Sequence, residues 1–259
     1  NLRLFSKGNT PSERDIEITN EWMAKIDTQE ANKPFFGYLF YDAAHGFDYP
    51  KDYKTPFKPS LEEVDYLELD DDYDSKPLVN RYKNSLHFID NEIGKIINQL
   101  QKKNLLENTI IVITGDHGQE FNDNKKGYWQ HGGNFSKYQI QVPMLVFDFS
   151  KPKKQYNHLT LHYDIAPTLM SSVLGVKNPI VDYSSGQDLY NTKERDWFVC
   201  GYNQKYSVIE KTKITNIHAS GLFDILDKNL NPIEEDLNYD IIGKALEITN
   251  QYYAKEAKK

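Results

Sequence analysis

This sequence of 259 residues has only one cysteine, no long apolar run and no excess of basic residues. Its single cysteine, Cys200, cannot form an internal disulfide, and one thiol does not distinguish a reducing from an oxidising compartment. No stretch approaches the roughly 20 apolar residues of a membrane helix, and the first residues do not resemble a signal peptide. With 31 basic against 38 acidic residues, the chain lacks the charge needed to bind a phosphate backbone, so we expect no nucleic-acid partner.

The composition is that of a folded domain, with 39% hydrophobic and 13% aromatic residues. This is enough apolar material for a sizeable core in one large domain or two unequal ones. The chain opens on Asn1 rather than Met, and we interpret it as a fragment of a longer protein.

Helical and strand patterns alternate along the first part of the chain. Apolar residues recur every three or four positions over residues 16–26 and 81–103, which predicts two amphipathic helices. Short aromatic or β-branched runs at 35–41, 109–114 and 142–149 predict strands, the first two buried on both faces of a parallel sheet. The helix at 81–103 and the strand that follows it form half of a βαβ unit, so the predicted class is α/β.

The second part of the chain has a different texture. Asp164 is a candidate N-cap for a helix that runs to residue 174, with Pro167 in its first turn and Gly175 as its stop. Beyond residue 191, apolar runs at 197–199, 206–209 and 222–226 alternate with polar turns, and a helix at 239–253 follows. We therefore predict a core over residues 1–190 and a small antiparallel β plus helix subdomain over residues 191–259.

An acidic segment interrupts the core, with eight acidic residues between Glu62 and Asp74. It has no glycine where a calcium-binding loop would need one, so we interpret it as a solvated excursion. Four histidines also have no partner that the sequence reveals. We predict that His158 is solvated and that the other three have structural roles, namely His87, His162 and His218.

The sharpest chemical feature is the run Gly115-Asp116-His117-Gly118, directly after the predicted strand at 109–114. Ligands in open α/β sheets gather beyond the carboxyl ends of strands, and the glycines allow a tight turn there. A carboxylate oxygen and an imidazole nitrogen suit zinc or manganese. Two ligands do not complete a metal site, so a structural Asp-His turn remains the alternative.

The segment 81–118, with Tyr82, Asp90 and Gly94 ahead of the strand and the Asp-His pair, resembles the central signature of the sulfatase family in the alkaline phosphatase superfamily. The resemblance continues through residues 141–144, 162–169, 186–189 and 222–225, in the family's order. It implies a three-layer sandwich with a mainly parallel central sheet, and a small C-terminal antiparallel sheet subdomain.

By this resemblance, Asp116 and His117 are two ligands of a catalytic divalent metal, with Zn, Mn, Mg and Ca not distinguished. His45 and His131 occupy the positions where phosphoethanolamine transferases and lipoteichoic acid synthases have substrate-binding histidines. Imidazole donors aimed at the outer oxygens of a phosphoryl or sulfuryl group would stabilise its transition state. The remaining ligands and the nucleophile would lie upstream of this chain.

Two departures from the family are visible. The formylglycine motif of true sulfatases is absent, because Cys200 is followed by Gly201-Tyr202-Asn203. Gln119 also separates the Asp-His-Gly run from Glu120, which leaves the role of Glu120 open.

Residues 128–136 and 139–143 resemble a branch of the family in Gram-negative envelopes that has N-terminal membrane helices and a periplasmic sulfatase-like domain. This implies an inner-membrane protein with its globular domain in the periplasm. One expectation is a hydrolase or phosphotransferase acting on a phosphorylated or sulfated, lipid-linked substrate. The other is an inactive module that senses lipopolysaccharide or cardiolipin, or docks a regulatory membrane protein. A nucleophile upstream would favour the first.

Overall fold

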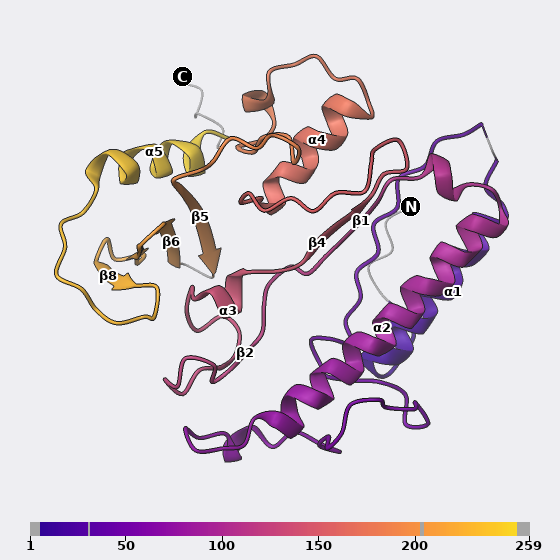
Figure 1. The fold of residues 1–259 in the computed structure, drawn as a ribbon, viewed down its shortest axis with the longest axis horizontal. Helices are drawn as coiled ribbons and strands as arrows, with labels where there is room; N and C mark the ends of the chain where they lie inside the picture. Colours follow the sequence, from indigo (N-terminus) through magenta and orange to yellow (C-terminus); the bar gives the residue numbers. More distant parts are fainter. Residues whose placement is uncertain (1–5, 31, 203–204, 253–259) are drawn as a thin grey trace, which may run out of the picture. The chain divides into compact units, whose positions relative to one another are not determined.

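The computed structural model describes residues 6–30, 32–202 and 205–252, and they divide into two compact units (Figure 1). Unit 1 holds the described residues up to Gly133 together with Gln141–Pro152. Unit 2 holds Asn134–Ile140 and the described residues from Lys153 onward. The predicted domain boundary at residue 190 stays a prediction.

Helix α1 of unit 1 spans Pro11–Asp27 and begins earlier than the predicted range of 16–26. A capping box explains the earlier start: the Thr10 hydroxyl accepts a hydrogen bond from the Glu13 N–H at 3.2 Å, and the Glu13 carboxylate accepts one from the Thr10 N–H at 3.4 Å. Pro11 takes the first helical position, where its missing N–H costs nothing.

Helix α2, Lys76–Lys102, confirms the predicted long amphipathic helix, which begins five residues earlier than its predicted start at residue 81. It packs against α1, and the two lie side by side in Figure 1. The buried centre of this contact consists of Ile26, Ile96 and Leu100. Apolar residues from the flanking loops and from the first strand cover this centre. They include Phe35, Leu39, Tyr41, Leu105, Leu106 and Ile111.

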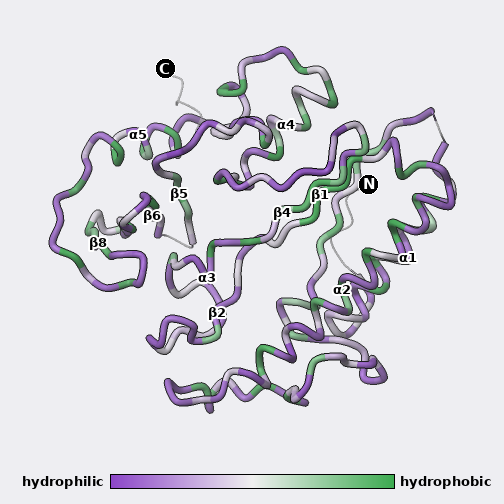
Figure 2. Tube along the Cα trace, in the orientation of Figure 1, coloured by the Kyte–Doolittle hydropathy of each residue, from purple (hydrophilic) through white to green (hydrophobic). Residues whose placement is uncertain are grey.

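Strands β1, Ile111–Thr114, and β4, Met144–Phe147, confirm two of the predicted strands and form a hydrophobic pair (Figure 2). They are antiparallel, with Ile111 opposite Phe147 and Thr114 opposite Met144. These two strands therefore do not supply the parallel pairing expected of the central sheet.

The predicted strand at residues 35–41 is wrong in the described structure, which assigns no strand there. The side chains still alternate between two sides, as the sequence pattern suggests. Phe35, Leu39 and Tyr41 pack toward the helices, whereas Phe36 and Tyr38 are 82% and 76% exposed. Alternation alone does not make a strand, because a strand also needs a hydrogen-bonded neighbour.

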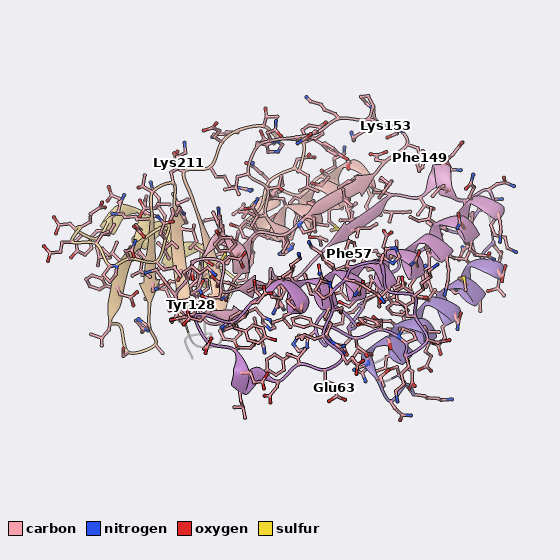
Figure 3. The ribbon with its side chains drawn as sticks, turned by 60° about the horizontal axis from the view of Figure 1, so that its bottom comes forward. Phe57, Glu63, Tyr128, Phe149, Lys153 and Lys211 are labelled. Carbon is pink, nitrogen blue, oxygen red and sulfur yellow. The ribbon has the colours of Figure 1, made fainter. Side chains whose placement is uncertain are left out.

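The acidic segment contains only the short 3₁₀ helix η1, Tyr66–Glu68, and most of its side chains are exposed, including Glu63 in Figure 3. The Asp65 carboxylate accepts a hydrogen bond from the Leu67 N–H at 2.9 Å. The predicted solvated excursion is confirmed. A second 3₁₀ helix, η2, spans Leu106–Asn108 and leads into β1.

Unit 2 contains an antiparallel sheet of four strands in chain order, which confirms the predicted C-terminal sheet. The sequence revealed three of these strands and missed β7, whose apolar residues are interrupted by threonine and asparagine. The strands are β5 (Trp197–Tyr202), β6 (Lys205–Glu210), β7 (Lys213–Ile217) and β8 (Phe223–Asp227). The predicted final helix is confirmed as α5, Tyr239–Asn250, and residue 253 lies outside the described residues.

The other helices of unit 2 are short. Helix α4 spans Ile165–Ser172 after the 3₁₀ helix η3, His162–Asp164, so it ends two residues before the predicted residue 174. Helix α3 covers Lys137–Ile140 and η4 covers Ile180–Asp182.

Asp164 precedes α4 as predicted, but its side chain does not cap the helix. The buried carboxylate instead accepts hydrogen bonds from the Leu161 N–H at 2.8 Å and the Gln187 N–H at 2.9 Å. Both terminal nitrogens of Arg195 also donate to it. A full positive charge and two amides outcompete the capping interaction for this carboxylate.

Candidate metal and anion-binding site

The Asp-His pair leaves the end of β1 in unit 1, as the sequence predicts. The Asp116 side chain is 64% exposed and that of His117 is 34% exposed. The Asp116 carboxylate accepts a hydrogen bond from the backbone N–H of His117 at 3.0 Å, which orients the carboxylate. Asp116 Oδ1 lies 3.7 Å from His117 Nε2.

The flanking glycines play a smaller part than the sequence suggests. Gly115 and Gly118 are not among the residues with positive φ. The left-handed backbone lies instead at Gln130 and Gly132, with φ of 72° and 76°, on either side of His131. The tight backbone at this site therefore positions His131 rather than the Asp-His pair.

His131 follows a short hairpin of strands β2, Glu120–Phe121, and β3, Trp129–Gln130. Glu120 pairs with Gln130, so Gln119 and His131 follow as the next facing residues. Gln119 Oε1 lies 3.0 Å from His131 Nδ1. At the far end of the hairpin, the backbone N–H of Asn122 donates to the carbonyl of Tyr128 at 2.8 Å; Figure 3 labels Tyr128.

Gln119 is thus a site residue that the sequence did not identify. In the sequence, Gln119 is visible only as a residue inserted between Gly118 and Glu120 relative to the family pattern. The glutamine oxygen accepts the Nδ1 proton of His131 and fixes the ring. Glu120, whose role was open, is fully buried and points away from solvent.

His45 lies in the tight loop after the segment 35–41. The His45 N–H donates to the Asp42 carbonyl at 3.1 Å, and Phe47 has a φ of 49° and is buried. The Phe47 ring contacts the rings of Tyr82 and Phe121, at centroid distances of 5.3 and 6.0 Å. This buried cluster joins the His45 loop to α2 and to strand β2.

The structure brings three of these histidines together. The rings of His117 and His131 are stacked with centroids 3.8 Å apart, and the His45 ring meets the His131 ring edge-on at 5.3 Å. All four predicted site residues therefore share one corner of unit 1. Within unit 1, His87 instead contacts the Tyr53 hydroxyl, and within unit 2, His218 contacts Asp224.

His158, predicted to be solvated, is half-buried and donates to the Leu189 carbonyl at 2.9 Å, so that prediction is wrong. His162 is exposed. Cys200 is half-buried within β5, and burial raises the pKa of its thiol to about 11, so it is not a reactive nucleophile.

The donors of Asp116 and His117 suit a divalent cation. The Gly118 carbonyl, 2.9 Å from His117 Nδ1, can only accept a hydrogen bond, so the neutral ring carries its proton on Nδ1 and its lone pair on Nε2. Two ligands that each lie about 2.1 Å from a tetrahedral metal are roughly 3.4 Å apart, close to the distance between Nε2 and Asp116 Oδ1. Within the described ranges, no group of three or more His, Cys, Asp or Glu residues is arranged to hold a metal.

Burial is the main influence on the titration of the site. It lowers the pKa of His131, and the neighbouring His117 and His45 lower it further, while Asp116 opposes them. Burial also raises the pKa of the Tyr82 hydroxyl, and Asp116 adds to this. The free site therefore favours a neutral His131 near pH 7.

The model of the family described as "Sulfatase" matches residues 5–176, about two thirds of the chain. The chain therefore belongs to the sulfatase family, whose superfamily members usually use a divalent metal ion. It has the α/β fold of that superfamily, with a small C-terminal antiparallel sheet. The fold is similar to the solved structure of a Vibrio parahaemolyticus protein in the alkaline phosphatase superfamily, with a TM-score of 0.59 and 16% identity. The match covers 98% of this chain and 58% of the Vibrio chain.

Among curated relatives, the chain is 25% identical over 167 residues to the inner membrane protein YejM of Salmonella typhimurium. The aligned region covers 64% of this chain and 28% of that protein. The chain is 29% identical over 157 residues to the phosphoethanolamine transferase EptA of Escherichia coli, covering 56% of this chain and 28% of that protein. The chain thus spans less than a third of the length of either relative. No helix in the described ranges is long and apolar enough to cross a bilayer.

Proposed function

We propose that this chain is part of a metal-dependent phosphoester or sulfoester hydrolase or phosphotransferase. The observation that carries the proposal is the meeting of His45, His117 and His131 beside Asp116, on three separate segments of unit 1. Transfer of an anionic group requires donors that hold a metal ion and, beside them, imidazoles that bind the transferred group.

In this proposal, Asp116 and His117 hold the divalent cation through Oδ1 and Nε2. The bound cation would act as a Lewis acid on an oxygen of the transferred group. His45 and His131 bind the outer oxygens of that group. Gln119 holds Nδ1 of His131, so Nε2 is the ring atom that meets the ligand.

The relatives support a lipid-linked substrate that carries a phosphate or sulfate group. One is named an inner membrane protein and another a phosphoethanolamine transferase. We accordingly propose that the whole protein lies in the inner membrane with this domain in the periplasm. A regulatory membrane protein is a further proposed partner.

A second candidate is a sulfatase fold without turnover, which senses lipopolysaccharide or cardiolipin or docks a partner to regulate outer-membrane lipid. The observation that favours it is the histidine cluster itself, because three imidazoles beside one another can bind an anionic headgroup without a metal ion. In this case the histidines would bind an anionic headgroup without cleaving it.

The test uses the protein extended upstream through the whole globular domain. Metal content by elemental analysis and turnover of a generic phosphodiester and a sulfate ester are compared with those of Asp116→Ala, with Asp72→Ala in the exposed acidic segment as the matched control. Metal and activity that vanish only in Asp116→Ala support catalysis. A folded domain with neither metal nor turnover supports the second candidate.

A further inference from the structure

The loop that carries His45 is held by a buried carboxylate on α1. Asp15 is fully buried, and its two oxygens each accept one backbone hydrogen bond. The Asp42 N–H reaches Oδ1 and the Ala43 N–H reaches Oδ2, both at 2.8 Å. Ala43 is fully buried as well, so the entrance to the loop has no solvent to replace these bonds.

The same helix also binds the loop at other points. Arg14 forms an ion pair with the Asp42 carboxylate. At the exit of the loop, the Ser12 N–H donates to the Asp48 carboxylate at 2.8 Å. Between them, a Cβ on Gly46 would lie 3.0 Å from Pro11, so the first turn of α1 lies directly against the loop.

These contacts leave His45 little freedom. Residues on both sides of it are fixed to the first two turns of α1, while its own side chain is exposed and meets the His131 ring. Loops move more than the helices they contact, so a site residue in a loop needs such support to keep its geometry.

We propose that Asp15 is a positioning residue, which sets the place of His45 relative to His131 for binding an anionic phosphate or sulfate group. The proposal rests on the function proposed for this site. Asp15 itself does not touch the ligand; it acts through the backbone of Asp42 and Ala43.

The chemistry requires a carboxylate. An asparagine offers a single acceptor oxygen, so its NH₂ group would face one of the two backbone N–H groups. Burial raises the pKa of Asp15 to about 6 and the Asp42 charge adds to this, while the two backbone hydrogen bonds and the Arg14 charge oppose it. At neutral pH the charged form, with two accepting oxygens, predominates.

The experiment is NMR of the chain with ¹⁵N-labelled histidine rings, in wild type, Asp15→Asn and the matched control Glu17→Gln. Glu17 is also an acid on α1 that accepts backbone N–H groups, but those of Lys7 and Gly8, away from His45. We expect Asp15→Asn to shift or broaden the His45 ring signals without ligand. His87 and His218 should keep their wild-type signals in both variants.

Inorganic phosphate is then titrated into each protein. We expect its apparent affinity at His45 to fall about fivefold to tenfold in Asp15→Asn, and to be unchanged in Glu17→Gln. If Asp15→Asn fails to fold, Asp48→Asn tests the same anchoring from the exit of the loop and should also displace His45.

A folded Asp15→Asn or Asp48→Asn with wild-type His45 signals would overturn the proposal, as would a phosphate affinity equal to that of wild type. The proposed function fails separately, if phosphate perturbs neither His45 nor His131 in the wild-type protein. The ligand-free spectra still decide whether Asp15 positions His45.

Discussion

Replacement of Asp164 by alanine should remove a buried ion pair that connects three segments of unit 2. The carboxylate is fully buried and accepts hydrogen bonds from the Leu161 N–H and the Gln187 N–H. The Arg195 guanidinium, whose side chain is only 14% exposed, donates two more. These contacts join η3, the loop before residue 190 and the segment leading to β5.

The magnitude follows from what the substitution leaves behind. Removing one member of a buried ion pair costs about 3–5 kcal/mol, because the other charge stays buried without a partner. Some water would reach Arg195 through its exposed edge, so we expect about 3–4 kcal/mol for Asp164→Ala. Asp164→Asn keeps the volume and one acceptor oxygen, and we expect about half of that loss.

The assay is urea unfolding followed by circular dichroism, with the double variant Asp164→Ala, Arg195→Met closing a double-mutant cycle. A coupling energy of about 2 kcal/mol between the two residues is expected. Glu194→Ala, which removes an exposed partner of Lys211, is the control and should leave the midpoint unchanged. A loss below about 1 kcal/mol in Asp164→Ala would refute this reasoning.

Three further predictions concern unit 1. Burial raises the pKa of Asp15 from 3.8 to about 6, so the stability that its protonation contributes is complete below pH 3.8 and is lost as the pH rises through 6. Between these two pH values, thermal unfolding should show the free energy of unfolding of the wild type falling by on the order of 3 kcal/mol relative to that of Asp15→Asn. Gln119→Met removes the acceptor of the His131 Nδ1 proton, and ¹⁵N spectra of the ring should show a mixture of tautomers; a single tautomer as in wild type would contradict the contact. Gly132→Ala places a side chain at a φ of 76° and should lower the free energy of unfolding by about 1 kcal/mol. Gly94→Ala lies within α2, where a Cβ meets no atom within 4 Å, and should raise the free energy of unfolding.

Local patterns carried the predictions that held. The apolar spacing of residues 81–103 identified α2, and the β-branched run at 109–114 identified β1, because both signals lie within one element. The Thr10 and Glu13 capping box is equally local, and reading it would have given the correct start of α1.

The errors arose where a neighbour decides the outcome. Residues 35–41 have the aromatic alternation of a strand, but no strand is assigned there because alternation does not supply a partner. Conversely, β7 has an unpromising polar composition, yet it pairs on both sides with β6 and β8. Asp164 had the sequence context of a cap, and Arg195, far along the chain, took its carboxylate instead.

By itself, the sequence determined the α/β class, the main helices, the C-terminal antiparallel sheet and the emergence of Asp116 and His117 from the end of a strand. Only the tertiary structure decided that His45 and His131 meet beside them, that Gln119 orients His131 and that Asp15 holds the His45 loop. The physical reason is the range of each interaction. Helix and strand propensities act within a few residues, whereas these contacts join segments that only packing brings together.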